Sequence, residues 1–292
     1  MISQGSLHPP SDSGPWVRVA SQGISKDTVC IWPASTPPGQ PLPAMGLARG
    51  GSWANRYFMF GDVKAFSQTA QELFDHDGLR LTHVCNFVDG GQRWWAGVAA
   101  SGDWGNRWWI SDDADAFAEH AQKLFDTEGL RLVHAWPYAE GGAVKVAGIA
   151  RSGDWGSRLL VRNDLASFST DAQTLFDEHG LRLTQVRTFV QGGVRRWLGI
   201  ARSGNWTNRW WISPDWASFV QKSQTYFDHD GLRLVHVTSY REGNQRRWIG
   251  IARSGDWANR LFLRPDLDLF NLTAQQYFEQ DGLRLLQMEV LE

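Results

Sequence analysis

Apolar and polar positions recur with a fixed period of 51 residues along most of the chain. A tryptophan, an arginine and a glycine each return five times at this spacing, without insertion or deletion from about residue 46 onward. Such a period indicates one supersecondary unit stacked on copies of itself, each copy burying the apolar face of its neighbour. The recurrent positions are Trp53, Trp104, Trp155, Trp206 and Trp257; Arg56, Arg107, Arg158, Arg209 and Arg260; and Gly78, Gly129, Gly180, Gly231 and Gly282.

The strands of one copy can be assigned between residues 130 and 161. Residues 130–136 alternate between apolar and polar side chains, and residues 144–150 return after a Gly141-Gly142 turn, which predicts a β-hairpin. Gly148 recurs in every copy inside the return strand and suggests a bulge or the close approach of another backbone. Residues 158–161 predict a short third strand.

A helix follows the third strand in every copy. Asp164 has the side chain of an N-cap, and Phe168, Ala172, Leu175 and Phe176 then form an apolar stripe at helical spacing. Gly180, the recurrent glycine that follows this stripe, predicts a left-handed C-cap. The same N-cap slot holds Asp62, Asp113, Asp215 and Asp266.

The predicted fold class is therefore α+β, with five tandem 51-residue β-β-β-α repeats. Residues 1–15 are expected to be a flexible leader, and residues 16–292 a single repeat domain that opens with a degenerate, proline-rich hairpin from Val29 to Ala48. Pairing of the C-terminal strand with the first copy would close a propeller-like ring; the alternative is an open, curved array. We favour the ring, because an unpaired terminal strand exposes a sheet edge. The predicted repeats are about 28–78, 79–129, 130–180, 181–231 and 232–282, with a closing strand at 283–292.

Composition and charge exclude several classes of protein. An apolar content of 42% with 13% aromatic residues is the opposite of a disordered chain, and a net charge of −2 argues against a polybasic nucleic-acid or membrane binder. No apolar run approaches the roughly 18 residues of a membrane span. No secretory signal is visible, although a removed signal would leave the same sequence, so the compartment stays open and leans to the cytoplasm. Cys30 and Cys85 form no metal or redox motif.

No catalytic, metal or cofactor site is predicted, and the chain is not expected to be an enzyme. The sequence contains no Ser-x-x-Lys, Gly-x-Ser-x-Gly or His-Glu-x-x-His string. His83, His134 and His236 share one repeat slot, which Gln185 and Gln287 fill in the other copies. Because glutamine serves there too, we interpret these histidines as half-buried or rim residues rather than as bases or ligands.

Two strings form the structural framework of the repeat. One is Gly129-Leu-Arg-Leu-Val-His134, followed by an aromatic residue and a Gly-Gly turn, and the other is the Arg-Trp-Ile-Gly-Ile-Ala segment that ends at Ala252. Together with the preceding helix, these strings resemble the bacterial tandem-repeat modules beside β-lactamase-like serine hydrolases and the N-terminal part of fungal polyglycine hydrolases. The resemblance covers five copies, about 85% of the chain. It implies an accessory or recognition domain without a defined chemistry. The Trp-Trp pairs and the Ser-Gly-Asp-Trp turn depart from the family pattern.

The candidate binding site is the turn Ser-Gly-Asp-Trp-x-Asn-Arg, which recurs once per copy. It places an indole, a carboxylate or amide, and a guanidinium in one short loop; a sugar offers C–H faces to the indole and hydroxyls to the polar groups. Several weak sites on one scaffold would gain avidity. The candidate residues are Trp53, Arg56, Asp103, Trp104, Arg107, Asp154, Trp155, Arg158, Asn205, Trp206, Arg209, Asp256, Trp257 and Arg260.

The same turn also has a structural interpretation. The tryptophan would fill the space between repeats, Asp103 would accept hydrogen bonds from the backbone N–H groups that follow it, and Arg107 would stack on Trp104.

The first functional hypothesis, based on the binding interpretation of the turn, is a lectin-like protein that binds carbohydrate multivalently. The alternative is a protein-interaction or structural scaffold, accessory to a separate hydrolase. The expected partners are a glycan or a protein, with no nucleic acid and no membrane insertion.

Variable tryptophan pairs offer a second candidate surface. They are Trp94-Trp95, Trp108-Trp109 and Trp210-Trp211, and other copies carry Leu-Leu or Leu-Phe at the last two pairs' positions. Because adjacent strand residues point to opposite faces, one member of each pair leaves the core side. These members form either an exposed aromatic patch or a second buried layer under the helices.

Overall fold

The computed structural model describes residues 16–19, 30–33 and 42–291. In this part of the chain, five helices and five separate sheets alternate as repeats of a three-stranded sheet plus a helix, which confirms the α+β repeat prediction. The chain divides into two compact units, residues 104–260 and residues 1–103 with 261–292. Residues 1–15, the expected leader, lie outside the described residues.

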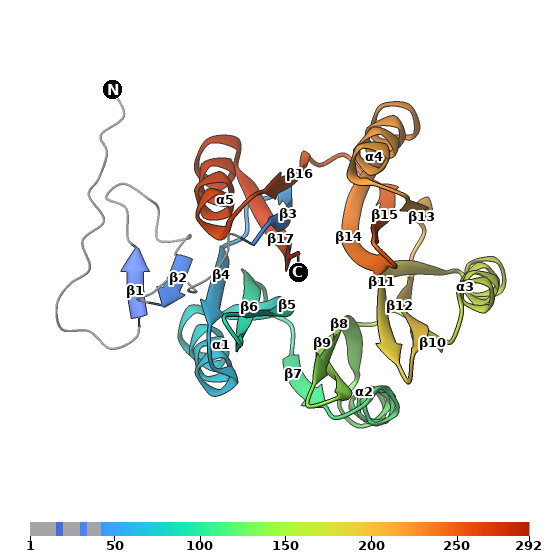
Figure 1. The fold of residues 1–292 in the computed structure, drawn as a ribbon, viewed down its shortest axis with the longest axis horizontal. Coiled ribbons are helices and arrows are strands. Elements are labelled where there is room, and N and C mark those ends of the chain that lie inside the picture. The colour runs from blue at the N-terminus through green and yellow to red at the C-terminus, as the bar shows by residue number, and fades with distance from the viewer. Residues whose placement is uncertain (1–15, 20–29, 34–41, 292) are drawn as a thin grey trace. The chain divides into compact units, whose positions relative to one another are not determined.

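The unit of residues 104–260 contains three similar sheets, each with a helix packed against it (Figure 1). The strand orders are β7-β9-β8, β10-β12-β11 and β13-β15-β14, all antiparallel. The elements are β7 (Asn106–Ser111), α2 (Ala114–Glu128), β8 (Leu130–Glu140), β9 (Ala143–Ser152), β10 (Ser157–Arg162), α3 (Leu165–His179), β11 (Leu181–Gln191), β12 (Val194–Ser203), β13 (Asn208–Ser213), α4 (Trp216–Asp230), β14 (Leu232–Glu242) and β15 (Gln245–Ser254).

The third strand of each sequence repeat joins the sheet of the following repeat. β10 follows the β8–β9 hairpin in the sequence, but it pairs with β12, from Ser157 opposite Arg202 to Arg162 opposite Trp197. A folded repeat therefore consists of a strand, then a helix, then a β-hairpin. Each sheet combines strands from two of the 51-residue segments that the sequence defines. This exchange ties consecutive repeats together by backbone hydrogen bonds as well as by packing.

The unit of residues 1–103 and 261–292 contains one five-stranded sheet, β1-β2-β4-β6-β5, and one three-stranded sheet, β16-β3-β17. β17 pairs with β3 from Leu283 opposite Gly50 to Val290 opposite Ala44, so the C-terminal strand shares a sheet with an N-terminal strand. The elements are β1 (Trp16–Val19), β2 (Cys30–Pro33), β3 (Ala44–Gly50), β4 (Asn55–Phe60), α1 (Val63–Asp77), β5 (Leu79–Asp89), β6 (Gln92–Ser101), β16 (Asn259–Arg264), α5 (Leu267–Asp281) and β17 (Leu283–Val290).

The predicted hairpin between Val29 and Ala48 is wrong. β2 pairs antiparallel with β1 and parallel with β4, at Ile31 opposite Phe58, while β3 pairs with β17. The strand expected to complete a local hairpin instead completes the sheet of a distant segment. Pairing across more than 200 residues leaves no local pattern in the sequence.

Local capping chemistry fixes the helix ends as predicted. The Asp164 carboxylate accepts a hydrogen bond from the backbone N–H of Ser167 at 2.7 Å, and Gly180 ends α3 in the left-handed conformation with φ 62°. The other four helices have the same two caps, at Asp62 and Gly78, Asp113 and Gly129, Asp215 and Gly231, and Asp266 and Gly282. The Gly141-Gly142 turn has φ 60° and 81°, as a two-residue hairpin turn requires.

The recurrent strand glycine makes room for aromatic rings rather than for a bulge or another backbone. A Cβ on Gly148 would lie 2.4 Å from Cε2 of Phe117 in α2 and 2.7 Å from Cζ2 of Trp109. The bulge lies on the partner strand instead, between Leu132 and His134. Because Phe117 is completely buried, this close approach anchors the helix to its sheet.

The cores are shared between neighbouring repeats. Phe117 of α2 and Val146 of β9 form one buried cluster with Leu198 and Ile200 of β12, which belongs to the next sheet. The next cluster combines Phe168 of α3 in the same way with residues of β15. Within residues 104–260, each repeat therefore buries its neighbour's apolar face, as the fixed period predicted.

Candidate functional site

The recurrent turn connects the second strand of one sheet to the third strand that joins the next sheet. Between β9 and β10, the hydroxyl of Ser152 accepts a hydrogen bond from the backbone N–H of Gly105 at 2.8 Å, while its own N–H donates to the Gly105 carbonyl at 2.9 Å. Ser203 holds Gly156 in the same way. The serine that opens each turn therefore clamps the turn of the preceding repeat.

The glycine of the turn lies beneath the indole of the tryptophan two residues later. A Cβ on Gly153 would lie 1.6 Å from Cζ3 of Trp155, and Gly51, Gly204 and Gly255 have equally close contacts with their own tryptophans. The indole thus folds back over the turn and is half-buried. Its position depends on the missing side chain of the glycine.

Arginines from the second strands contact these indoles within residues 104–260. The guanidinium carbon of Arg151 lies 5.0 Å from the ring centroid of Trp104 and 4.9 Å from that of Trp155, at cation–π distance. The same contacts continue along the unit to Trp257 at distances between 4.9 and 5.1 Å. We name the alternating series Trp104, Arg151, Trp155, Arg202, Trp206, Arg253 and Trp257 the Trp–Arg ladder.

A second arginine in each repeat holds the backbone of the turn. Nε of Arg131 in β8 donates to the carbonyl oxygen of Trp155 at 2.7 Å, and Arg182 in β11 donates to that of Trp206 at 2.6 Å. Arg131 also faces Arg151 across the β8–β9 pair. Each of these turns is therefore surrounded by positive side chains on neighbouring strands.

Burial affects the acidity of the ladder arginines. Desolvation lowers the pKa of Arg151, and it lowers the pKa of Arg202 together with the nearby positive charge of Arg151. Both remain charged at neutral pH, because an arginine guanidinium starts from a very high pKa. The ladder is consequently a row of half-buried cations.

The arginine that ends each turn is separated from the tryptophan. Nε of Arg107 lies 3.4 Å from a carboxylate oxygen of Glu128, the last residue of α2, and Arg209 pairs with Asp230 of α4 at the same distance. Arg56 pairs with Asp77, Arg158 has no hydrogen bond or ion pair with a described residue, and Arg260 donates to the carbonyl of Asn259 at 3.2 Å. The expected stacking of Arg107 on Trp104 is wrong, since Arg151 contacts Trp104 instead.

The acidic and amide side chains beside the tryptophans are exposed. Asp103, Asp154, Asn205 and Asp256 form no hydrogen bond or ion pair with the residues the structure describes, so the expected bond from Asp103 to its following backbone is not made. The candidate triplets of indole, acid and arginine are therefore not assembled within residues 104–260: the tryptophans contact the ladder arginines, while Arg107 and Arg209 pair with helix carboxylates.

The asparagine of the turn connects adjacent sheets. Nδ2 of Asn208 donates to the carbonyls of Leu183 at 3.1 Å and Ala252 at 3.4 Å. Asn259 makes the stronger form of this contact, with its amide bonded to both the N–H and the carbonyl of Leu234. Asparagine was a recurrent position in the sequence, yet its role depends on contacts to another repeat that spacing does not reveal.

The ladder arginines escaped the sequence analysis. Arg151, Arg202 and Arg253 each precede the Ser-Gly pair of the turn at the same 51-residue spacing, and Arg49 and Ala100 occupy this slot in the earlier copies. Within its own unit, Arg49 lies 4.8 Å from the ring centroid of Trp53. The conserved spacing between copies was the available signal. Each turn also contains an arginine of its own, so the spacing alone does not show which arginine contacts the indole.

The shared histidine slot is structural. His83, His134 and His236 are fully buried rather than half-buried, and Nε2 of His236 donates to the carbonyl of Val186 at 2.9 Å. Nε2 of Gln185 donates to Nδ1 of His134 at 3.0 Å, while its oxygen accepts from the N–H of Ala135 at 2.8 Å. These side chains link first strands of neighbouring sheets, so histidine and glutamine serve the same purpose.

Three of the six variable tryptophans are buried. Trp94 and Trp95 are 4% and 3% exposed, and Trp211 stacks on Phe219 of α4. This confirms the second buried layer at these three positions. Trp108, Trp109 and Trp210 are half-buried, and Trp109 stacks on Phe117 of α2.

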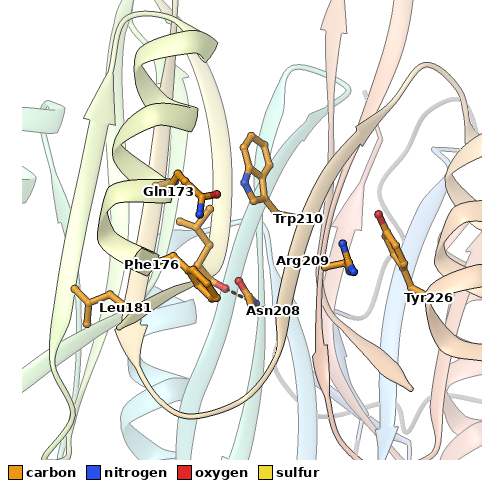
Figure 2. A pocket seen from close by; sticks show the side chains of 9 residues that line it. Gln173, Phe176, Leu181, Asn208, Arg209, Trp210 and Tyr226 are labelled. Atoms are coloured by element: carbon orange, nitrogen blue, oxygen red, sulfur yellow. Dashed lines mark hydrogen bonds between the residues drawn. The ribbon is translucent and has the colours of Figure 1, made fainter. Parts of the chain in front are cut away.

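Trp210 lines a shallow pocket of about 240 Å³ between α3 and β13 (Figure 2). Phe176 and Gln173 contribute from α3, while Tyr226 and Arg209 stand on the other side. The lining combines three polar residues, Gln173, Asn208 and Arg209, with aromatic rings and holds no cluster of acid, base and nucleophile. Among the described residues, no group of three histidine, cysteine, aspartate or glutamate side chains could hold a metal ion.

The described helices are too short and too polar to cross a membrane. Cys85 is buried.

Comparison with known proteins supports the repeat resemblance. Residues 67–99 and 218–251 match the family model described as polyglycine hydrolase-like, structural repeat. Each match begins within a helix, α1 or α4, and ends in or at the end of the second strand, β6 or β15, so it follows the helix–hairpin frame of the folded unit. No curated protein sequence matches the chain, and no solved structure does. The two segments of this chain are thus similar to the structural repeat of polyglycine hydrolase-like proteins.

Proposed function

We propose that the chain is a non-catalytic repeat scaffold that serves as a recognition or accessory module beside other proteins. One observation carries this proposal: the serine, the asparagine and the tryptophan of the recurrent turn are engaged within the repeat array. The serine clamps the preceding turn, the asparagine bonds to adjacent sheets, and the indole of Trp155 packs between arginines. Recurrence of the turn is then explained by assembly of the array, without a ligand.

Multivalent carbohydrate binding is the second candidate. The exposed carboxylate of Asp154 beside a half-buried indole in a repeated turn favours it. Against it, two guanidiniums already lie within 5 Å of the Trp155 ring, where a sugar would have to stack. We therefore place the scaffold role first and leave glycan binding to the test.

A glycan array combined with two variants separates these candidates. Under the scaffold proposal, the full chain binds no glycan, and Trp104→Ala and Trp257→Ala lower the midpoint of urea unfolding. Glycan binding that disappears in both variants while their unfolding midpoints stay unchanged would establish the lectin role instead. Arg158→Gln is a suitable control, because this side chain has no hydrogen bond or ion pair with a described residue.

We also propose that the chain performs no hydrolysis. The buried ring nitrogens of His83 and His236 are bonded to backbone carbonyls, which leaves them poorly placed to accept a proton from a nucleophile. Incubation with a polyglycine-containing peptide and with a chromogenic ester tests this proposal. We expect no turnover above that of a heat-denatured sample; turnover that follows the protein through purification would contradict it.

We further propose that the repeats close into a propeller-like ring rather than an open array. The pairing of β17 with β3 supports closure. In this pair, the C-terminal strand β17 takes the position of the first hairpin strand of a repeat, and the N-terminal strand β3 takes the position of the second. Deletion of residues 283–292 should then lower the unfolding midpoint of the full chain sharply. A deletion variant with the same midpoint and the same small-angle scattering curve would favour the open array.

A further inference from the structure

The Trp–Arg ladder contains two cations whose charge is balanced by no described carboxylate. Arg151 and Arg202 form no ion pair or hydrogen bond with any residue the structure describes, and the Nε atom of each is buried without an acceptor. Arg107, by contrast, pairs with Glu128. Arg151 and Arg202 are half-buried, and a guanidinium that has no carboxylate partner in the protein retains its capacity to bind an anion.

The two guanidiniums are also close to one another. Each lies 4.9 Å from the centroid of the Trp155 ring, so their separation is at most about 10 Å, which is about the Debye length at an ionic strength of about 0.1 M. The positive charge of Arg151 contributes to the lowered pKa of Arg202. Because the Trp155 indole lies between the two guanidiniums, a separate carboxylate at the half-exposed end of each would offset this repulsion.

The surroundings are suited to an anion. Arg131 and Arg182 lie 5.9 Å from the Trp155 and Trp206 rings and add two further positive charges. Asp154, the acidic residue of the intervening turn, is exposed and forms no ion pair with a described arginine. The local positive charge therefore persists in a chain whose net charge is −2.

We propose that the Trp–Arg ladder binds an acidic peptide segment, whose carboxylates accept hydrogen bonds from Arg151 and Arg202. This inference rests on the proposed recognition scaffold and names the chemistry of its partner. A carboxylate matches the planar fork of a guanidinium. The arginines lie about 10 Å apart at most, a distance that three extended residues span at about 3.3 Å each. Duplex DNA carries one charge per about 1.7 Å, which is far denser than this row.

Titration of the full chain with hexaglutamate, followed by intrinsic tryptophan fluorescence at low salt, tests the proposal. Hexaglutamine is the neutral comparison, and Arg151→Gln and Arg202→Gln are the site variants. Arg107→Gln is the matched control, because it also removes one arginine charge but at a side chain paired with Glu128. Far-UV circular dichroism verifies folding of each variant. Arg202→Lys, which keeps the charge and loses the planar fork, replaces any glutamine variant that fails to fold.

The proposal predicts that hexaglutamate binds and hexaglutamine does not. Arg107→Gln should bind as the unchanged chain does, while each ladder variant should lose about tenfold or more in affinity. Absence of hexaglutamate binding, or equal affinity in the ladder and control variants, would overturn it. An oligothymidylate of the same charge that binds more tightly would indicate a nucleic-acid site, and inorganic phosphate of equal affinity would indicate a single-ion site; both results also overturn the peptide. In each of these cases the scaffold proposal stands unless the glycan or hydrolysis assays are positive.

Discussion

Replacement of Gly153 by alanine should displace the indole that its missing side chain accommodates. The new Cβ would lie 1.6 Å from Cζ3 and 2.3 Å from Cε3 of Trp155. Because carbon atoms pack at about 3.5 Å or more, the ring must move by about 2 Å. It then loses its contacts with Arg151 and Arg202, each worth about 0.5–1 kcal/mol at a partly exposed site, together with part of its buried area. We expect a loss of about 2–3 kcal/mol in the free energy of unfolding.

Urea unfolding followed by far-UV circular dichroism measures this loss. Trp155→Ala alone should cost about 3 kcal/mol, the lower end of the range for a buried tryptophan, because the indole is only half-buried. The double variant Gly153→Ala with Trp155→Ala should be no less stable than Trp155→Ala, since the clash disappears with the ring. Gly105→Ala, whose Cβ meets its nearest neighbour at 3.4 Å, is the control and should change little. Additive losses in the double variant would refute the packing of the indole over Gly153.

Three further changes test other parts of the account. Gly148→Ala should cost about 1–3 kcal/mol of unfolding free energy through its clash with Phe117, and Phe117→Leu should restore part of it in the double variant; no rescue would contradict the close approach. Asn208→Ala should cost about 1–2 kcal/mol because it removes bonds to the Leu183 carbonyl and to the neighbouring strand, whereas a thermal shift equal to zero would show that the asparagine does not connect the sheets. The capping hydrogen bonds from Ser167 lower the pKa of the Asp164 carboxyl from its ordinary value of 3.8, so its stabilisation is present above pH 3.8 and is lost as the pH falls through the folded-state pKa. Asp164→Asn keeps the cap without a titrating group and should make the melting temperature less dependent on pH in this range. An unchanged pH dependence would argue against the cap.

Local features of the fold were readable from the sequence. The five helices begin at an aspartate and end at a glycine, because N-cap and C-cap preferences act within a few residues of the chain. The Gly141-Gly142 turn was equally predictable from the backbone it requires. Comparison between copies replaced an alignment for these features.

Pairings between repeats were not readable. β10 joins the sheet of β12, and β3 pairs with β17. The alternation of apolar and polar residues in each of these strands would be compatible with many other partner strands. A strand pattern states which face is apolar and leaves the partner undefined. The Val29–Ala48 hairpin was wrong for this reason.

The candidate site illustrates the same limit. Spacing located every recurrent tryptophan, but it grouped Trp155 with Arg158 of its own turn, whereas the structure groups it with Arg151 and Arg202. Adjacent residues on a strand point to opposite faces, so sequence neighbours are often not spatial neighbours. The polar residues that contact an indole must come from strands aligned beside it.

The most direct test of the Trp–Arg ladder is a double-mutant cycle between Trp155 and Arg202, measured by urea unfolding of the full chain. Trp155→Ala, Arg202→Ala and the double variant should reveal a coupling of about 0.5–1 kcal/mol, since each side chain contacts the other. The same cycle between Trp155 and Arg107, which pairs with Glu128, should give no coupling. Absence of coupling in both cycles would contradict the ladder and would mean that the Trp155 indole is available to bind a ligand.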